Sequence, residues 1–263
     1  MSSVRSAPQV EHVYGIHPVL EALRARRRTL RRLEVRHGRA GPEVEGVVRA
    51  AQALGVPVRR VAAEELARGL APGVQSQGVV LVAGPLPTLP LPALARMGSS
   101  PRTLVALDGL EDPGNVGAIA RAAEACGAQG LILTRRRSSP LSPAVARASA
   151  GAVEWLAASR VPNLPRALND LKENGFWVFG SDPEAPEELF ELPERLLRGD
   201  RVVVFGAEGR GLRRGVVKVL DHRVRIPMDG EVASLNAGSA AAVVLYELRR
   251  RTRLAAEVQL SYL

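Results

Sequence analysis

The 263-residue chain is poor in cysteine and aromatic residues, and each shortage excludes a class of protein. The single cysteine, Cys126, has no partner within the chain, so a fold that is stabilised by disulfide bonds is excluded. Aromatic residues make up only 3% of the sequence, which argues against a surface of base-stacking rings. With 46% hydrophobic residues the chain has enough apolar mass to fold, and its length favours one or two domains.

The chain also lacks an apolar run that would predict a membrane span or the core of a signal peptide. The uncharged run at 232–246 is shorter than the roughly 20 apolar residues that cross a bilayer. The longer uncharged run at 69–95 is interrupted by proline, glycine and glutamine. Together with the lone cysteine, these features predict a cytoplasmic protein without membrane association.

Positive charge, in contrast, is plentiful and lies mostly in the first two-fifths of the chain. Residues 1–100 contain 14 arginines and 7 acidic residues, whereas residues 101–263 contain 22 basic and 20 acidic residues. A dense arginine patch attracts a polyanion, because the guanidinium group binds phosphate through two parallel hydrogen bonds. We therefore expect RNA contacts from Arg24, Arg26, Arg27, Arg28, Arg31 and Arg32. Composition is the competing explanation, since the whole chain uses 34 arginines and only 2 lysines.

Proline marks the clearest boundary in the chain. Five prolines fall within 84–101, where they suppress helix and strand hydrogen bonding and favour an extended, semi-rigid linker. The sequence thus predicts an N-terminal domain at 12–84, a linker at 85–101 and a C-terminal domain at 102–253.

Strand-like and helix-like segments alternate on both sides of this boundary. In the N-terminal part, the predicted helices are 17–26, 43–54 and 63–68, and the predicted strands are 30–35, 56–61 and 78–83. In the C-terminal part, the predicted strands are 103–107, 130–134, 176–180, 201–205 and 222–226, and the predicted helices are 115–126, 142–149, 165–174 and 235–250. This alternation predicts the α/β class, with a mostly parallel sheet that is covered on both faces.

The first chemically suggestive cluster, 107–127, reads as a strand, a turn and a helix that Asn115 is suited to cap. Open α/β sheets bind ligands at the carboxyl ends of their strands, so Asn115 and Arg121 are candidate site residues. A plain strand-to-helix turn, with Arg121 as a solvated charge, explains the same pattern.

The second cluster, 202–212, is an apolar strand that runs into glycines around Glu208. Glycines allow close approach of the backbone to a ligand, but the spacing is G-x-x-G-x-G and does not match a dinucleotide or phosphate-binding loop. The third cluster, 225–251, is a strand, a turn and a helix of small residues that Ser234 or Asn236 could cap. Its small residues permit very close packing, either in the core or at a helix–helix interface.

In this order, the three clusters resemble the three motifs of the SpoU (TrmH) family of RNA ribose 2′-O-methyltransferases. The resemblance is strongest to the two-domain bacterial branch that methylates a guanosine of large-subunit ribosomal RNA. The motif residues are Asn115, Gly117, Arg121, then Gly206, Glu208, Gly209, then Ile226, Pro227, Ser234, Leu235 and Asn236. Tyr14-Gly15-Ile16 resembles the opening of the family's substrate-binding domain, a small ribosomal-protein-like α/β unit. This chain has Ser76 where relatives often have histidine, so an RNA contact of that histidine does not carry over.

The resemblance implies a C-terminal domain tied as a deep trefoil knot that binds S-adenosylmethionine without a metal. Gly206, Ile226, Met228 and Leu235 would hold this methyl donor. It also implies a homodimer with its sites at the subunit interface, and an RNA substrate. The implied catalytic residues are Asn115, Arg121, Glu208, Ser234 and Asn236.

Relatives assign removal of the hydroxyl proton to the arginine at the position of Arg121. A guanidinium group is too weak an acid to act as a base near neutral pH, so we expect Arg121 to hold a phosphate and polarise the hydroxyl instead. Three other functions remain open: a transfer RNA methyltransferase, a non-catalytic RNA-binding assembly factor, and another nucleotide-dependent α/β enzyme such as a dehydrogenase.

Overall fold

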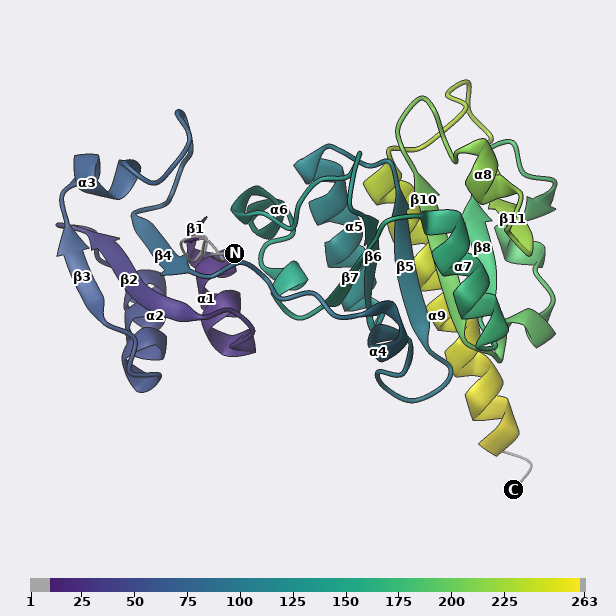
Figure 1. The fold of residues 1–263 in the computed structure, drawn as a ribbon, viewed down its shortest axis with the longest axis horizontal. Helices are drawn as coiled ribbons and strands as arrows, with labels where there is room; N and C mark the ends of the chain where they lie inside the picture. The colour runs from purple at the N-terminus through teal and green to yellow at the C-terminus, as the bar shows by residue number, and fades with distance from the viewer. Residues whose placement is uncertain (1–9, 261–263) are drawn as a thin grey trace, which may run out of the picture. The chain divides into compact units, whose positions relative to one another are not determined.

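The structure, a computed structural model, describes residues 10–260 except for the side chains at 197 and 255–260. The chain forms two compact units (Figure 1). The first unit reaches Pro87 and also contains the separate segment Pro140–Trp155, whereas the second contains Thr88–Ser139 and the chain from Leu156 onward. Nothing in the sequence pattern predicted that 140–155 joins the N-terminal part.

The first unit is built on a four-stranded mixed sheet with the order β1-β4-β2-β3. β4 is antiparallel to both β1 and β2, and β2 is parallel to β3. The elements of this unit are β1 (Glu11–Tyr14), α1 (Ile16–Ala25), β2 (Leu30–Arg36), α2 (Pro42–Ala53), β3 (Val58–Val61), α3 (Ala63–Ala67), β4 (Val79–Ala83), α6 (Pro143–Ala148) and the 3₁₀ turn η1 (Ala152–Glu154). The strand β1 was not predicted, because only four residues are involved and only Val13 among them is fully buried.

A buried ion-pair network joins the 140–155 segment to the rest of this unit. The Nε atom of Arg28 donates to both carboxylate oxygens of Glu154, at 3.0 and 2.8 Å, and its Nη1 donates to Glu11 at 2.6 Å. The side chains of Arg28 and Glu154 are fully buried. Burial lowers the pKa of Arg28, but its hydrogen bonds to Glu154 and Glu11 outweigh that effect and raise the pKa overall. Arg28 is therefore a charged structural residue.

The second unit contains a seven-stranded sheet with the order β7-β6-β5-β10-β8-β11-β9, and all of its pairings are parallel. Its elements are α4 (Leu91–Ala95), β5 (Thr103–Asp108), α5 (Pro113–Ala125), β6 (Gly130–Thr134), β7 (Ala157–Val161), α7 (Leu164–Glu173), β8 (Trp177–Ser181), β9 (Glu187–Glu188), η2 (Leu189–Glu191), η3 (Glu194–Leu197), β10 (Arg201–Gly206), α8 (Arg214–Val217), β11 (His222–Arg225) and α9 (Ala237–Leu260). The predicted α/β class with a mostly parallel sheet is confirmed.

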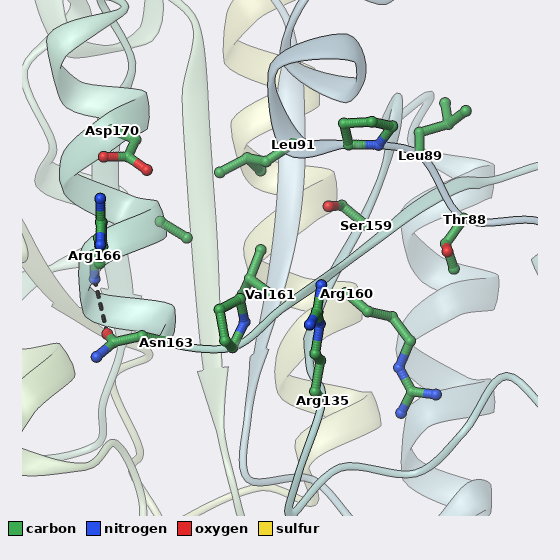
Figure 2. A pocket seen from close by; sticks show the side chains of 13 residues that line it. Thr88, Leu89, Leu91, Arg135, Ser159, Arg160, Val161, Asn163, Arg166 and Asp170 are labelled. Atoms are coloured by element: carbon green, nitrogen blue, oxygen red, sulfur yellow. Dashed lines mark hydrogen bonds between the residues drawn. The ribbon is translucent and has the colours of Figure 1, made fainter. Parts of the chain in front are cut away.

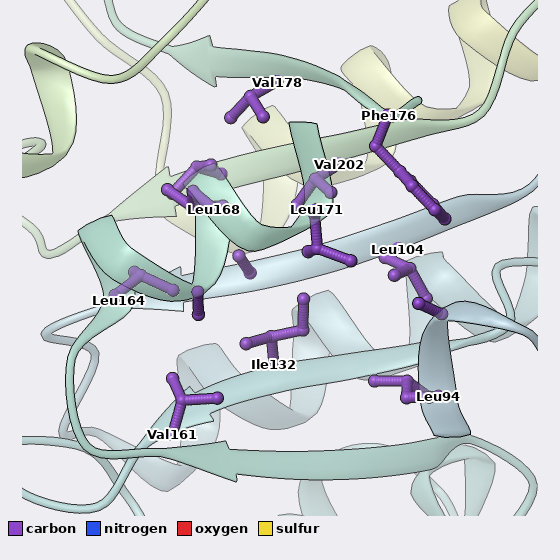
Figure 3. Close-up of a cluster of buried hydrophobic side chains, with 14 of the residues drawn as sticks. Leu94, Leu104, Ile132, Val161, Leu164, Leu168, Leu171, Phe176, Val178 and Val202 are labelled. Atoms are coloured by element: carbon purple, nitrogen blue, oxygen red, sulfur yellow. The ribbon is translucent and has the colours of Figure 1, made fainter. Parts of the chain in front are cut away.

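Helices cover both faces of this sheet, with α4, α7 and α8 on one face and α5 and α9 on the other (Figure 1). Alternate residues of the strands face each layer; Leu104, Val202 and Val178, for example, pack against α7 (Figure 3). The expectation of an extended linker is wrong at Leu91–Ala95, which forms α4 and buries Leu94 completely in this core. The prolines permit that helix because two of them fall at its start, where no backbone N–H is needed.

The helices α5 and α9 pack unusually closely, as the small residues of α9 predicted. A β carbon at Gly238 would lie 2.5 Å from the β carbon of Ala118, so only glycine fits at this crossing. The cap of α5 differs from expectation. The helix begins at Pro113, and the carboxylate of Asp112 accepts a 2.8 Å hydrogen bond from the backbone N–H of Asn115. The side chain of Asn115 is therefore available for another role.

Candidate active site at the carboxyl edge of the parallel sheet

A cavity of about 670 Å³ lies at the carboxyl ends of β8 and β10. We call it the glycine-loop cavity, because residues 206–212 form one wall. The other walls come from 181–184, Val217, Arg223, 234–237 and Ala240. A smaller hollow of about 50 Å³ shares Ser234 and Leu235 with it and so lies beside it. All four residues predicted to hold the methyl donor line these spaces: Gly206 the larger, Ile226 and Met228 the smaller, and Leu235 both.

The glycine loop folds tightly back on the end of β10. A β carbon at Gly206 would lie 2.3 Å from the carbonyl carbon of Gly211, and the N–H of Gly211 donates to the carbonyl of Ala207 at 2.8 Å. Gly209 and Gly211 have φ angles of +72° and +60°, which favour glycine. Gly206 is thus required by the loop's own backbone, a reason for glycine here that the sequence did not reveal.

The side chain of Asn236 connects three of the predicted catalytic residues. Its Nδ2 donates to Oδ1 of Asn115 at 2.9 Å and to Oε1 of Glu208 at 2.5 Å, while its Oδ1 accepts from the N–H of Gly238 at 2.9 Å. The last bond shows that Asn236, and not Ser234, caps α9. One carboxamide therefore fixes the starts of α9 and α5 and the glycine loop relative to each other.

This arrangement leaves hydrogen-bonding groups available for a ligand. Within the described residues, the Nδ2 of Asn115 and the second carboxylate oxygen of Glu208 form no hydrogen bond. Asn115 is buried, whereas Glu208 is exposed on the cavity wall. Ser234 is exposed and lines both spaces. The cluster thus offers an N–H donor and a carboxylate acceptor next to the cavity.

Arg121 stands apart from this cluster. It is exposed on α5, lines neither space, and forms no hydrogen bond or ion pair with any side chain that the structure describes. Six residues at 100° each place it about 120° around the helix from Asn115. A single copy of the chain therefore brings together Asn115, Glu208 and Asn236, with Ser234 beside them, and leaves Arg121 outside.

Two charged pairs near the cavity were not predicted. Asp108 is fully buried at the carboxyl end of β5, and it accepts from the backbone N–H of Arg213 at 2.8 Å and from its Nε at 2.5 Å. Asp182 accepts from Nε and Nη2 of Arg223 at 3.1 and 2.7 Å, and both residues line the cavity. Each aspartate follows a predicted strand, and this position at the carboxyl edge of the sheet is the sequence feature that could have indicated both as candidate site residues.

The arginines predicted to contact RNA divide into exposed and buried groups. Arg26 and Arg31 are exposed; Arg24 is exposed and pairs with Glu21 at 2.8 Å. Arg32 pairs with Glu34 at 2.6 Å but keeps 39% of its side chain exposed. Arg27 is partly buried and donates to the carbonyl of Glu154 at 3.1 Å; burial lowers its pKa.

Arg28 does not fit the expectation of an RNA contact, because its side chain is fully buried against two glutamates.

Burial also decides the role of the single cysteine. It raises the pKa of the Cys126 thiol to about 11, so this group is a neutral packing residue at physiological pH.

Within residues 10–260, no helix is both long enough and apolar enough to cross a membrane. In the same part of the chain, no three His, Cys, Asp or Glu side chains gather closely enough to hold a metal ion.

Comparison with known sequence families gives two matches. The profile of the SpoU rRNA Methylase family matches residues 102–246, and that of RNA 2′-O ribose methyltransferase substrate binding matches residues 12–89. The chain is 38% identical over 250 residues to the 23S rRNA (guanosine-2′-O-)-methyltransferase RlmB of Pseudomonas aeruginosa, covering 94% of this chain and 99% of the relative. It is 36% identical over 238 residues to the protein of the same description from Bordetella pertussis, covering 90% and 96%.

Solved structures agree with these matches. The SpoU methyltransferase AviRb from Streptomyces viridochromogenes, in complex with its cofactor AdoMet, superposes with a TM-score of 0.76 at 25% identity. That alignment covers 94% of this chain and 91% of the other. An AdoMet-bound rRNA methyltransferase from Sinorhizobium meliloti has a TM-score of 0.73 at 26% identity, covering 92% and 87%.

Proposed function

Because the chain belongs to the SpoU rRNA methylase family, we propose that it methylates a ribose 2′-hydroxyl of RNA with S-adenosylmethionine as methyl donor. We propose a guanosine of 23S ribosomal RNA as the target, as the names of the P. aeruginosa and B. pertussis relatives describe. The observation that carries the proposal is the Asn115–Asn236–Glu208 cluster beside the glycine-loop cavity.

The glycine-loop cavity fits the methyl donor. Its volume of about 670 Å³ is in the range of small-molecule sites, roughly 300–1,000 Å³. Leu235, Ile226 and Met228 give an apolar wall, and the loop at 206–212 presents backbone groups. The carboxylates of Glu184 and Glu208 line the same space and suit a positively charged ligand. When bound, S-adenosylmethionine supplies a methyl group already activated by its sulfonium.

The protein then has to align the 2′-oxygen with the methyl group and to help the hydroxyl proton leave. Alignment alone can contribute several kcal/mol, about 7–11 in favourable cases. We assign to Asn115 and Glu208 the positioning of the ribose, with Asn236 holding both in place and Ser234 shaping the floor. Arg121 holds an RNA phosphate and polarises the hydroxyl, so that no covalent enzyme intermediate or metal is required.

We also propose that the protein acts as a homodimer, in which Arg121 of one copy completes the site of the other. The support is that Arg121 lines no part of the cavity in its own chain. Mixing inactive Arg121→Ala and Glu208→Ala proteins tests this. If sites are shared between copies, random pairing restores about one quarter of the wild-type sites. If each chain holds a complete site, the mixture stays inactive.

The remaining parts of the proposal concern the RNA and the cell. Residues 12–84 hold the RNA through the exposed arginines Arg24, Arg26, Arg31 and Arg32, and residues 85–101 lead to the catalytic domain at 102–253, which carries the family's trefoil knot. Phosphate contacts set the register, and RNA shape and base contacts select the site. We place the protein in the cytoplasm, where ribosomal RNA is made and assembled.

Methyl transfer from labelled S-adenosylmethionine tests the reaction directly. Unmodified large-subunit ribosomal RNA and bulk transfer RNA are offered side by side to the wild type and to Arg121→Ala. Label in ribosomal RNA that is lost in the variant is the expected result. Label in transfer RNA alone would keep the reaction and overturn the substrate, and no binding of the methyl donor would leave a non-catalytic RNA-binding role.

A further inference from the structure

A second cavity in the same unit, of about 590 Å³, lies at the carboxyl ends of β6 and β7 (Figure 2). We call it the arginine cavity, because Arg135, Arg160 and Arg166 line it from three separate segments. Arg135 directly follows β6, Arg160 lies in β7, and Arg166 lies in the first turn of α7. The rest of the lining is mostly apolar or uncharged, and Asp170 is its one acidic residue.

The charges of these arginines are not neutralised by the protein. Within the described residues, none of the three guanidinium groups forms an ion pair or a hydrogen bond, and Asp170 pairs with none of them. The Nε of Arg160 is shielded from solvent and has no hydrogen-bond partner. A buried donor without a partner costs stability, so a ligand that accepts this hydrogen bond would offset the cost.

The position of Arg166 at the start of α7 adds to the unneutralised positive charge of the cavity. The N-terminus of a helix carries partial positive charge, which favours an acid there and disfavours a base. The first turn of α7 nevertheless contains Arg166 and no acidic residue. A negative ligand in the cavity would interact favourably with both the arginine and the helix end.

The backbones that carry the three arginines are held firmly. The N–H of Arg135 donates to the carbonyl of Val161 at 2.9 Å, and β7 pairs in register with β6 around Arg160. The side chain of Asn163 caps α7 by accepting from the N–H of Arg166 at 3.0 Å. The three side chains therefore start from fixed positions around one space.

We infer that the arginine cavity binds a phosphodiester group of the RNA substrate, apart from the exposed arginines of the first unit. The guanidinium groups would hold the phosphate, and a volume of about 590 Å³ leaves room for the attached nucleoside against Leu89, Pro90 and Leu91. The inference rests on the proposed function, because that function supplies the RNA.

The test compares the variant R135Q/R160Q/R166Q with R195Q/R198Q/R214Q, which removes the same charge from exposed arginines of the same unit. Affinity for an unmodified fragment of large-subunit ribosomal RNA is measured over a series of salt concentrations. We expect the cavity variant to bind about tenfold more weakly than the control. Its plot of log affinity against log salt should be shallower by about one. Equal behaviour of the two variants would overturn the inference.

Further measurements distinguish RNA binding in the arginine cavity from misfolding, from methyl transfer and from binding of free phosphate. The variant R135Q/R166Q leaves the partly buried Arg160 in place, so a loss of RNA affinity in it cannot come from misfolding at that residue. Unchanged binding of S-adenosylmethionine checks the fold. A wild type that binds RNA in the cavity without methylating it would defeat the proposed function and leave the inference standing. Inorganic phosphate that binds the wild type more tightly than the RNA fragment does would assign the cavity to a free phosphate ligand and overturn it.

Discussion

The glycine-loop cavity and the arginine cavity lie along the same carboxyl edge of one parallel sheet, yet they differ in whether their polar side chains are hydrogen-bonded within the protein. In the first, Asn236 uses both ends of its carboxamide on Asn115, Glu208 and Gly238. In the second, the guanidinium groups find no partner in the described part of the chain. The first is a site whose geometry the protein fixes in advance, and the second is a charged space in which the described residues give the guanidinium groups no partner.

The largest effect is expected from breaking the fixed geometry of the first cavity. Asn236→Ala removes the bridge between Asn115 and Glu208, and we expect methyl transfer to fall about 10²–10³-fold, as when other preorganised hydrogen-bond donors are removed. The lost cap of α9 should cost only about 1 kcal/mol of stability. Ser239→Ala, an exposed position on the same helix, is the control. Initial rates that match those of the control would show that the bridge is not needed for turnover.

The shape of the glycine loop should matter next. Gly206→Ala forces a β carbon into the backbone of Gly211, and overpacking of this kind costs about 1–3 kcal/mol, so methyl-donor affinity should fall about tenfold. At Gly209, a β carbon would meet nothing within 4 Å, so Gly209→Ala adds only backbone strain of about 1 kcal/mol. Calorimetric titration of S-adenosylmethionine compares the two, and similar affinities would contradict this account of the loop.

A smaller effect tests the unneutralised charge of the second cavity. Inorganic phosphate in excess, at constant ionic strength, should raise the melting temperature of the wild type by a few degrees, because a ligand of the folded state stabilises it. Arg160→Met should abolish this increase, and Arg214→Met should keep it. A phosphate effect that persists in Arg160→Met would place the bound anion elsewhere.

The smallest effect concerns Cys126, which lies at the end of α5, the helix that also carries Asn115. With a thiol pKa of about 11, only about a thousandth of the group is thiolate at pH 8, so alkylation by iodoacetamide should be slow there and accelerate as the pH approaches 11. Cys126→Ser should leave methyl transfer nearly unchanged. A large loss of turnover without a loss of stability would show that positioning alone does not explain the reaction.

The sequence predicted the elements that have a strong local signal. The predicted strands at 130–134 and 201–205 contain the apolar runs 131–133 and 202–205, and the structure places β6 and β10 there. β7 was missed because Ala157–Val161 contains alanine, serine and arginine, so neither its periodicity nor its composition is typical of a strand. For the first cavity, the place of Asn115 after a predicted strand made it a candidate. The resemblance to a family, rather than periodicity, supplied the roles of Asn115, Glu208, Ser234 and Asn236.

Contacts between distant residues could not be read from the chain. Asn236 meets Asn115 across 121 residues, and nothing local to either residue indicates that one carboxamide joins them. The error at Arg28 has the same origin. Its surroundings in sequence are basic, and its neutralising partner Glu154 lies 126 residues away. A run of basic residues therefore predicts an exposed surface only when the fold brings no acidic residue from a distant part of the chain against it.

The packing of Pro140–Trp155 into the first unit also limits how the protein can be divided into fragments or recombined with relatives. Pro140–Trp155 belongs to the first unit although it is encoded within the second, so no single cut yields two intact halves. A fragment that ends at Pro87 would lack Glu154, and Arg28 would lose the partner that balances its buried charge. An exchange of the N-terminal unit between relatives must therefore carry two separate stretches of gene, which makes this enzyme less modular than its two-domain order suggests.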